Sequence, residues 1–298
     1  MNTNTKGALL MVAGMTAYTL NDTLVKLLGA DLPLSQILVL RGTIATVGLY
    51  ALARALREQL AVADRRARVF MLVRTAFEVA ATYFFLSALL VMPIANATAV
   101  MQALPLTVTL AAAVMISEPV GWRRSLAIAA GFIGMLLIVR PGADGFAEGT
   151  FYVLLAVAFI TGRDMITRVM PQGVPAMSLA ISAGLGVTLL GCGLSATEQW
   201  VSITINHVLL LFGAASLILT GYVCSVVAMR FGDVSFTAPF RYAGLLVALV
   251  AGLLLFDQWP DTLTLLGAAV VVGAGLFTLF RTNQAKQEHQ PGENRARN

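Results

Sequence analysis

The chain has 298 residues, of which 58% are hydrophobic and only 12% are charged, and its mean hydropathy is +0.82. Soluble domains carry about 25% charged residues, so this composition excludes a single soluble domain, and its apolar content also excludes disordered, collagen-like and coiled-coil chains. With two cysteines and two histidines, the sequence has no disulfide framework and argues against a histidine-rich metal or haem site. We therefore expect a polytopic membrane protein without a cofactor or a metal centre.

Ten apolar runs follow one another along the chain, and most are long enough to cross a bilayer as a helix. Continuous runs of this kind favour helices over the alternating strands of a barrel. The predicted spans are residues 7–28, 34–56, 69–91, 94–116, 125–139, 150–170, 176–196, 207–229, 234–256 and 262–280. Pro105 and Pro239 lie inside the fourth and ninth spans and predict kinks there. Glycines of the fifth and tenth spans predict close helix contacts; they are Gly131, Gly134, Gly267, Gly273 and Gly275.

The basic residues in the loops and at the span ends predict the orientation of the chain. If the N-terminus is cytoplasmic, the external loops hold Arg140 alone. The cytoplasmic segments then hold Lys6, Arg54, Arg57, Arg65, Arg66, Arg68, Arg123, Arg124, Arg168, Arg230, Arg281, Lys286, Arg295 and Arg297. We therefore expect both termini in the cytoplasm, and we expect the polar tail, residues 282–298, to be disordered.

The two halves of the chain resemble each other. Asp22 and Asp164 are 142 positions apart, as are Gly42 and Gly184, while the pair Thr98-Ala99 recurs 139 positions later. Each half holds five spans, an odd number, so the second half must enter the membrane upside down. The predicted fold is therefore an all-α polytopic membrane protein of two inverted five-helix repeats, residues 7–140 and 149–281. Such repeats are typical of secondary transporters with a substrate site near the midplane, and a duplicated scaffold is the alternative.

Charged side chains inside the predicted spans mark candidate functional positions, because a charge in lipid is costly. The basic ones are Lys26, Arg41, Arg74, Arg163 and Arg241, and the acidic ones are Asp22, Glu78 and Asp164. Their sum of +2 favours an anionic or carbonyl-rich substrate, because arginine offers forked donors. The alternative is neutralisation within one helix by pairs four residues apart, such as Asp22 with Lys26 or Asp164 with Arg168.

The candidate site combines these charges with polar and aromatic neighbours. Arg74 and Glu78 have no counterparts in the second half, where Gly213 and Leu217 stand, and this asymmetry favours a substrate contact over a scaffold role. The predicted substrate-binding residues are Arg41, Arg74, Glu78, Tyr83, Asn96, Gln102, Arg163, Arg241 and Tyr242. The proton-coupling candidates are Asp22, Glu78 and Asp164. The sequence contains no phosphate-binding loop or nucleophile elbow, so we expect no enzymatic activity and no catalytic residues.

Several short segments resemble the ten-helix EamA branch of the drug/metabolite transporter superfamily over residues 7 to 281. They are residues 117–119 (SEP) and 140–142 (RPG) and, for the subgroup with riboflavin importers and S-adenosylmethionine uptake carriers, residues 21–26 (NDTLVK), 40–42 (LRG), 74–80 (RTAFEVA) and 95–99 (ANATA). The resemblance implies a carrier of the bacterial inner membrane that imports a small metabolite, with riboflavin as the first substrate to consider. S-adenosylmethionine uptake and export of an amino acid, metabolite or drug are alternatives, and a non-transporting subunit or an intramembrane enzyme is the rival class. The implied partners are a small-molecule substrate and the lipid bilayer, without nucleic acid; a homodimer is left open.

Overall fold

The computed structural model describes residues 3–62, 64–117, 121–140, 148–171, 173–231 and 234–288. Within these residues the chain is helical. The helices are α1 Thr3–Leu28, α2 Leu34–Ala55, α3 Arg65–Val91, α4 Ile94–Met101, α5 Leu104–Met115, α6 Trp122–Val139, α7 Glu148–Val169, α8 Ala176–Leu194, α9 Ile205–Phe231, α10 Val234–Thr237, the 3-10 helix η1 Ala238–Tyr242, α11 Ala243–Phe256 and α12 Thr262–Glu288. Residues 118–119, 141–142 and 289–298, which carry part of the predicted motifs and tail, lie outside the described ranges.

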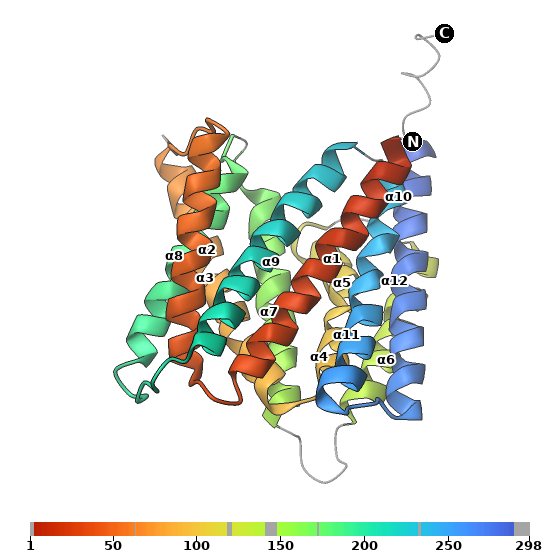
Figure 1. The fold of residues 1–298 in the computed structure, drawn as a ribbon. Coiled ribbons are helices and arrows are strands. Elements are labelled where there is room, and N and C mark those ends of the chain that lie inside the picture. The colour runs from red at the N-terminus through yellow and green to blue at the C-terminus, as the bar shows by residue number, and fades with distance from the viewer. Residues whose placement is uncertain are drawn as a thin grey trace.

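Ten helical spans in the described part of the chain are long and apolar enough to cross a membrane. They coincide with the ten predicted spans to within a few residues, so the predicted fold class is confirmed. The tenth span ends at Phe280, as predicted. The α12 helix continues to Glu288, however, and takes in the first residues of the tail that we expected to be disordered. The start of α1 and the end of α12 lie at the same end of the bundle (Figure 1). We call this end the terminal face and the opposite end the far face.

The fourth and ninth spans are both broken, as their prolines predict. The fourth span stops at Met101 and resumes as α5, with Pro105 in its first turn. The ninth span passes from α10 through η1, with Pro239 in the first turn of that segment, into α11. Proline has no N–H to donate and is tolerated where a helix begins. The two breaks fall on Gln102 and Arg241, positions 139 residues apart.

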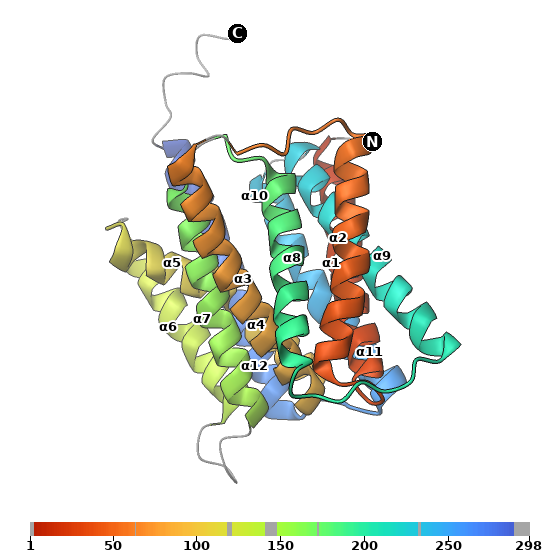
Figure 2. The same cartoon turned by 90° about the vertical axis from the view of Figure 1, so that its left-hand side faces the viewer.

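Four helix pairs make the most extensive contacts in the bundle. They are α1 with α9, α3 with α7, α2 with α8, and α6 with α12. Counted along the chain, these are spans 1 and 8, 3 and 6, 2 and 7, and 5 and 10. Exchanging every span with the one five places away leaves this set of pairs unchanged. Figures 1 and 2 show α2 beside α8 and α6 beside α12.

Glycines let α2 and α8 approach closely at a reciprocal crossing. A Cβ at Gly42 of α2 would lie 2.6 Å from Oγ1 of Thr188, and a Cβ at Gly184 of α8 would lie 2.4 Å from Oγ1 of Thr46. Thr46 follows Gly42 by four residues, and Thr188 follows Gly184 by four. Each glycine therefore contacts the threonine of the other helix. A larger residue at either glycine position would displace that threonine.

The glycines of α6 and α12 largely behave as predicted. A Cβ at Gly134 would lie 2.8 Å from the Gly267 carbonyl oxygen, and a Cβ at Gly267 would lie 2.5 Å from that of Gly134. Gly131 and Gly275 also face close neighbours, whereas nothing lies within 4 Å of a Cβ placed at Gly273. The prediction of a close contact is thus wrong for Gly273 alone.

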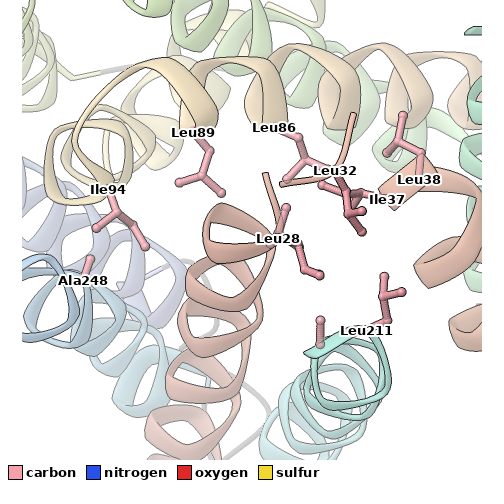
Figure 3. Close-up of a cluster of buried hydrophobic side chains, with 11 residues drawn as sticks. Leu28, Leu32, Ile37, Leu38, Leu86, Leu89, Ile94, Leu211 and Ala248 are labelled. Carbon is pink, nitrogen blue, oxygen red and sulfur yellow. The ribbon is translucent and has the colours of Figure 1, made fainter. Parts of the chain in front are cut away.

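A buried apolar cluster fills the far face of the bundle. Its members come from the end of α1, the start of α2, the end of α3, the start of α4, α9 and α11 (Figure 3). They are Val25, Leu28, Leu32, Ile37, Leu38, Leu86, Leu89, Ile94, Leu211, Ala214 and Ala248, all buried. We call them the far-end cluster. Because these helices converge on one apolar mass, the far face is closed.

Lys26 lies beside the far-end cluster and does not form the predicted ion pair with Asp22. Its Nζ donates instead to the carbonyl oxygens of Leu89 at 2.5 Å and Met92 at 2.7 Å. The last carbonyls of a helix have no partner within the helix and attract a cation. The end of α3 offers two such acceptors, so Lys26 ties α1 to α3 and strengthens the closed end.

Asp261, which lies outside the spans, predicts a small acid sensitivity. It accepts a hydrogen bond from the backbone N–H of Thr264 and pairs with Arg140, and these contacts lower its pKa from 3.8 to about 2. A carboxyl whose folded pKa is depressed stabilises the fold above its unfolded pKa, and this contribution is lost as pH falls from about 4 towards 2. Both side chains are more than a third exposed, so solvent screening limits the ion pair to less than about 1 kcal/mol.

We expect Asp261→Asn to lower the thermal unfolding temperature by a few degrees at most at pH 7, and to have a much smaller effect near pH 2. Thermal melts of detergent-purified protein between pH 7 and pH 2 measure this difference. A difference that stays constant, or grows as pH falls, would contradict the ion pair as its source.

Candidate functional site

A cavity of about 520 Å³ lies between α1, α2, α3, α7, α8, α9 and η1. It occupies the half of the bundle nearest the terminal face, because its lining residues on α1 all lie between Met11 and Tyr18, and on α8 they begin at Ala176, the first residue of that helix. At its inner end it meets Leu38, which belongs to the far-end cluster, and Val187, which packs against it. The cavity therefore reaches toward the terminal face and stops at the apolar closure.

Five of the nine predicted substrate-binding residues line this cavity: Arg41, Arg74, Glu78, Arg163 and Arg241. Four arginines thus face one glutamate, and no other charged side chain lines the cavity within the described residues. This wall of guanidinium groups in a low-dielectric bundle creates a positive potential that favours anions.

Glu78 is the centre of a charged network that joins α3 to α7. Nη1 of Arg163 lies 3.1 Å from both oxygens of Glu78, and Nη2 of Arg74 lies 3.4 Å from Oε2 of the same carboxylate. Arg163 also pairs with Asp164, Nη2 to Oδ1 at 2.7 Å, and Nε of Arg74 donates to Oγ1 of Thr167 at 3.0 Å. The pair of Arg74 and Glu78 follows from their spacing on one helix. The contact from Arg163 crosses between helices and is not readable from the sequence.

Arg41 and Asp22 form a second charged group, on α2 and α1. The Arg41 side chain is only 8% exposed, and its Nη1 has no hydrogen-bond partner. Its opposing charge is Asp22, which interacts with it electrostatically and accepts a hydrogen bond from Asn21 at 2.9 Å. Arg241 lies on η1, at the break of the ninth span, and is exposed. Neither arginine makes a hydrogen bond or an ion pair within the described part of the chain.

The other four predicted substrate-binding residues lie away from the cavity lining. Tyr83 packs edge-on against Phe84, with ring centroids 5.3 Å apart, in an aromatic cluster between α3 and α7. Asn96 lies on α4, and Gln102 follows that helix at the break. Tyr242 is buried with its hydroxyl toward Gly275 of α12. Residue type and depth in the membrane predicted that all four would contact a substrate. The rotation of each helix directs their side chains away from the cavity.

The cavity also contains residues that the sequence did not indicate. Tyr18 and Tyr222 line it from α1 and α9, together with Met11 and Met15. The only signal for Tyr18 is its position one helical turn before Asp22, and the methionines look like any apolar residue of a span. No three His, Cys, Asp or Glu side chains of the described residues come together in a way that could hold a metal ion.

Comparison with known proteins agrees with this architecture. Residues 5–140 match the EamA-like transporter family. An S-adenosylmethionine uptake transporter of Rickettsia bellii is 27% identical over 196 residues, 65% of this chain and 66% of the relative. A riboflavin transporter of Vibrio cholerae is 27% identical over 198 residues, 66% of each chain. The chain thus spans about two thirds of the length of these relatives.

Two further similarities extend over nearly the whole chain. A pseudopaline exporter of Pseudomonas aeruginosa is 26% identical over 280 residues, 93% of this chain and 97% of the relative. A solved crystal structure aligns with a TM-score of 0.67 at 18% identity, covering 93% of this chain and 98% of the other, which shows a common fold. The predicted resemblance is confirmed: the chain is a multi-pass membrane protein, and its residues 5–140 match the EamA-like transporter family.

Proposed function

We propose that this protein is a secondary transporter that carries a small organic metabolite through its cavity by alternating access. One observation carries the proposal: a charged cavity reaches toward the terminal face while the far-end cluster closes the other. A carrier needs a site that is accessible from one side at a time, and a cavity that ends on an apolar closure near mid-depth has this form. Its volume of about 520 Å³ suits a metabolite-sized ligand.

The arrangement of the spans supports the proposal that the two halves are inverted repeats, residues 7–140 and 149–281. The four main helix pairs are unchanged when the halves are exchanged, and the crossing of α2 with α8 is reciprocal down to the glycine and threonine contacts. In inverted-repeat transporters the substrate site lies between the repeats, with broken helices beside it. Here Arg241 lies both at such a break and in the cavity wall.

We propose import across the bacterial inner membrane, with the terminal face in the cytoplasm. The basic residues in the loops and at the span ends support this orientation. The names of the aligned relatives make riboflavin and S-adenosylmethionine the substrates to test first. Export is the alternative direction, because a pseudopaline exporter aligns over 93% of the chain.

Asp22, Glu78 and Asp164 are our proton-coupling candidates. Glu78 is held by Arg74 and Arg163, and Asp164 is held by Arg163. Asp22 has the least occupied carboxylate of the three, with one hydrogen bond from Asn21 and an electrostatic interaction with Arg41. Asp22 is therefore the first of the three to test.

Counterflow in proteoliposomes tests the proposed function. Purified protein is reconstituted with unlabelled compound inside, and uptake of the labelled compound is followed for riboflavin and for S-adenosylmethionine. We expect counterflow of at least one compound, and net uptake that increases with an imposed pH gradient in the wild type but not in Asp22→Asn. Thr43→Ala, on the exposed side of α2, is the control variant.

The rival class predicts a different result in the same vesicles. A non-transporting subunit would give no counterflow of any compound despite correct insertion, and an intramembrane enzyme would convert the compound without moving it. Either result would contradict transport. Counterflow that does not depend on pH would leave transport standing and remove Asp22 as the coupling group.

A further inference from the structure

Arg41 is a buried charged group of the cavity that makes no hydrogen bond or ion pair within the described residues. It lines the cavity at mid-helix on α2, its side chain is 8% exposed, and its Nη1 is buried without a partner. Within the described residues no hydrogen bond or ion pair reaches it, and Asp22 acts on it only through its electrostatic interaction. A buried guanidinium has five N–H donors, and leaving them unmet is costly. A ligand that enters the cavity can supply acceptors to this guanidinium.

The arginines of the charged network between α3 and α7 differ from Arg41, because they make ion pairs with the protein. Arg163 is satisfied by Glu78 and Asp164. Arg74 contacts Glu78 and Thr167, although its Nη1 is buried without a partner, as is that of Arg41. These two arginines join α3 to α7 before any substrate binds. Arg41 does not join two helices in this way. The carbonyl oxygens of its own helix accept backbone hydrogen bonds, and within the described residues no carboxylate forms an ion pair with it.

The surroundings of Arg41 leave room for a ligand. The lining beside it consists of small residues on both sides of the α2–α8 crossing, which are Gly42, Ala45, Ala183 and Gly184. Ala183 stands at the position that matches Arg41 in the second half, so only one of the two halves offers a cation here. The α2 side of the cavity therefore carries a cation where the matching position on α8 carries a small apolar residue.

We infer that Arg41 forms an oxyanion subsite, and that the transported metabolite carries a carboxylate which this guanidinium binds. The inference rests on the proposed function and narrows its substrate class. A carboxylate accepts two parallel hydrogen bonds from the arginine fork, a geometry that lysine cannot reproduce. The exposed Arg241 lines the same cavity from η1 and adds positive potential, and it makes no ion pair within the described residues. An uncharged compound such as riboflavin can offer carbonyl acceptors to Arg41 but no opposing charge.

Ligand-induced thermal stabilisation of the full chain in detergent tests this subsite. The probes are S-adenosylmethionine, succinate and glutamate, each paired with the corresponding primary amide, and riboflavin as an uncharged compound. We expect at least one carboxylate to raise the unfolding temperature of the wild type while its amide does not. Removing the charge in Arg41→Gln should weaken that carboxylate about 10- to 100-fold, as expected for a charge-assisted hydrogen bond. Arg41→Lys should recover part of the affinity.

Arg54→Gln is the matched control, because Arg54 is exposed near the end of the same helix and loses the same charge. Elution from a sizing column and the melt without ligand report whether Arg41→Gln folds; if it does not, Arg41→Lys keeps the charge and still tests the fork. Equal binding of a carboxylate and its amide, or wild-type affinity in both Arg41 variants, overturns the inference. Riboflavin counterflow at the wild-type rate in Arg41→Gln would overturn it and leave transport standing. A wild-type protein that neither binds nor exchanges any probe contradicts both.

Discussion

Replacing Glu78 with glutamine is expected to lower the free energy of unfolding by about 3 kcal/mol and to abolish transport. Glu78 is the shared partner of Arg163 and Arg74, whose side chains are 23% and 15% exposed. Glutamine keeps the shape of the side chain but removes its charge, so two guanidiniums then repel each other across the α3–α7 interface. Removing one member of a buried ion pair costs about 3–5 kcal/mol, and the partial exposure here places the effect at the lower end.

Unfolding in mixed micelles, followed by circular dichroism, measures this loss. Glu58→Gln is the control, because Glu58 is exposed in the loop after α2 and changes the formal charge equally. A second variant, Glu78→Gln combined with Arg74→Gln, removes the guanidinium whose ion pair is with Glu78, leaves Arg163 paired with Asp164, and should recover part of the stability. A Glu78→Gln protein as stable as Glu58→Gln would show that the network does not hold α3 to α7.

Gly42→Ala is expected to destabilise the bundle by about 1–3 kcal/mol, the usual cost of overpacking. Its new methyl group would lie 2.6 Å from Oγ1 of Thr188, and that hydroxyl donates to the Gly184 carbonyl oxygen at 2.9 Å. Thr188 therefore cannot rotate away without losing a hydrogen bond worth about 1 kcal/mol.

A double variant makes this prediction specific to the crossing. Gly42→Ala with Thr188→Ala removes the hydroxyl and leaves the Thr188 Cβ position 3.5 Å from the new methyl group, an ordinary contact, so most of the lost stability should return. Gly42→Ala with Thr46→Ala is the matched control, since Thr46 faces Gly184 instead. Thermal melts of the wild type, the single variants Gly42→Ala, Thr188→Ala and Thr46→Ala, and the two double variants give the coupling energy of each pair. Equal rescue by both threonine variants would argue against the reciprocal packing.

The sequence was sufficient for the spans, because run length and the need to satisfy the backbone in lipid leave few alternatives. The two broken helices were also predictable, since Pro105 and Pro239 act on their own helices. Contacts between helices were harder. Lys26 could reach Asp22 on its own helix, yet the end of α3 provides better acceptors. The partner of Lys26 depends on which helix lies beside α1, and this neighbour cannot be read from a single sequence.

The candidate site was predictable to the extent that charge alone defines it. The cost of burying arginine in lipid identified Arg41, Arg163 and Arg241, and all three line the cavity. Polarity and aromaticity were weaker guides, because they carry no such cost. The ring of Tyr83 packs on Phe84 and does not line the cavity. Tyr18, which the sequence did not indicate, lines the cavity instead. The difference between the two tyrosines is the rotation of α1 and α3, which only the packed bundle fixes.

The reciprocal contact between α2 and α8 lies near the middle of both helices, and this position makes it a fulcrum. A helix end about 10 residues from the crossing lies about 15 Å away, so a tilt of about 10° would move it by about 3 Å. The two ends of a rigid rod move in opposite directions about its centre. Tilting α2 and α8 together about the Gly42 and Gly184 contacts would narrow one face of the bundle by the amount that it widens the other. A rigid tilt of this kind passes through no position in which both faces are open. An open path across the membrane would require a helix to bend rather than to tilt.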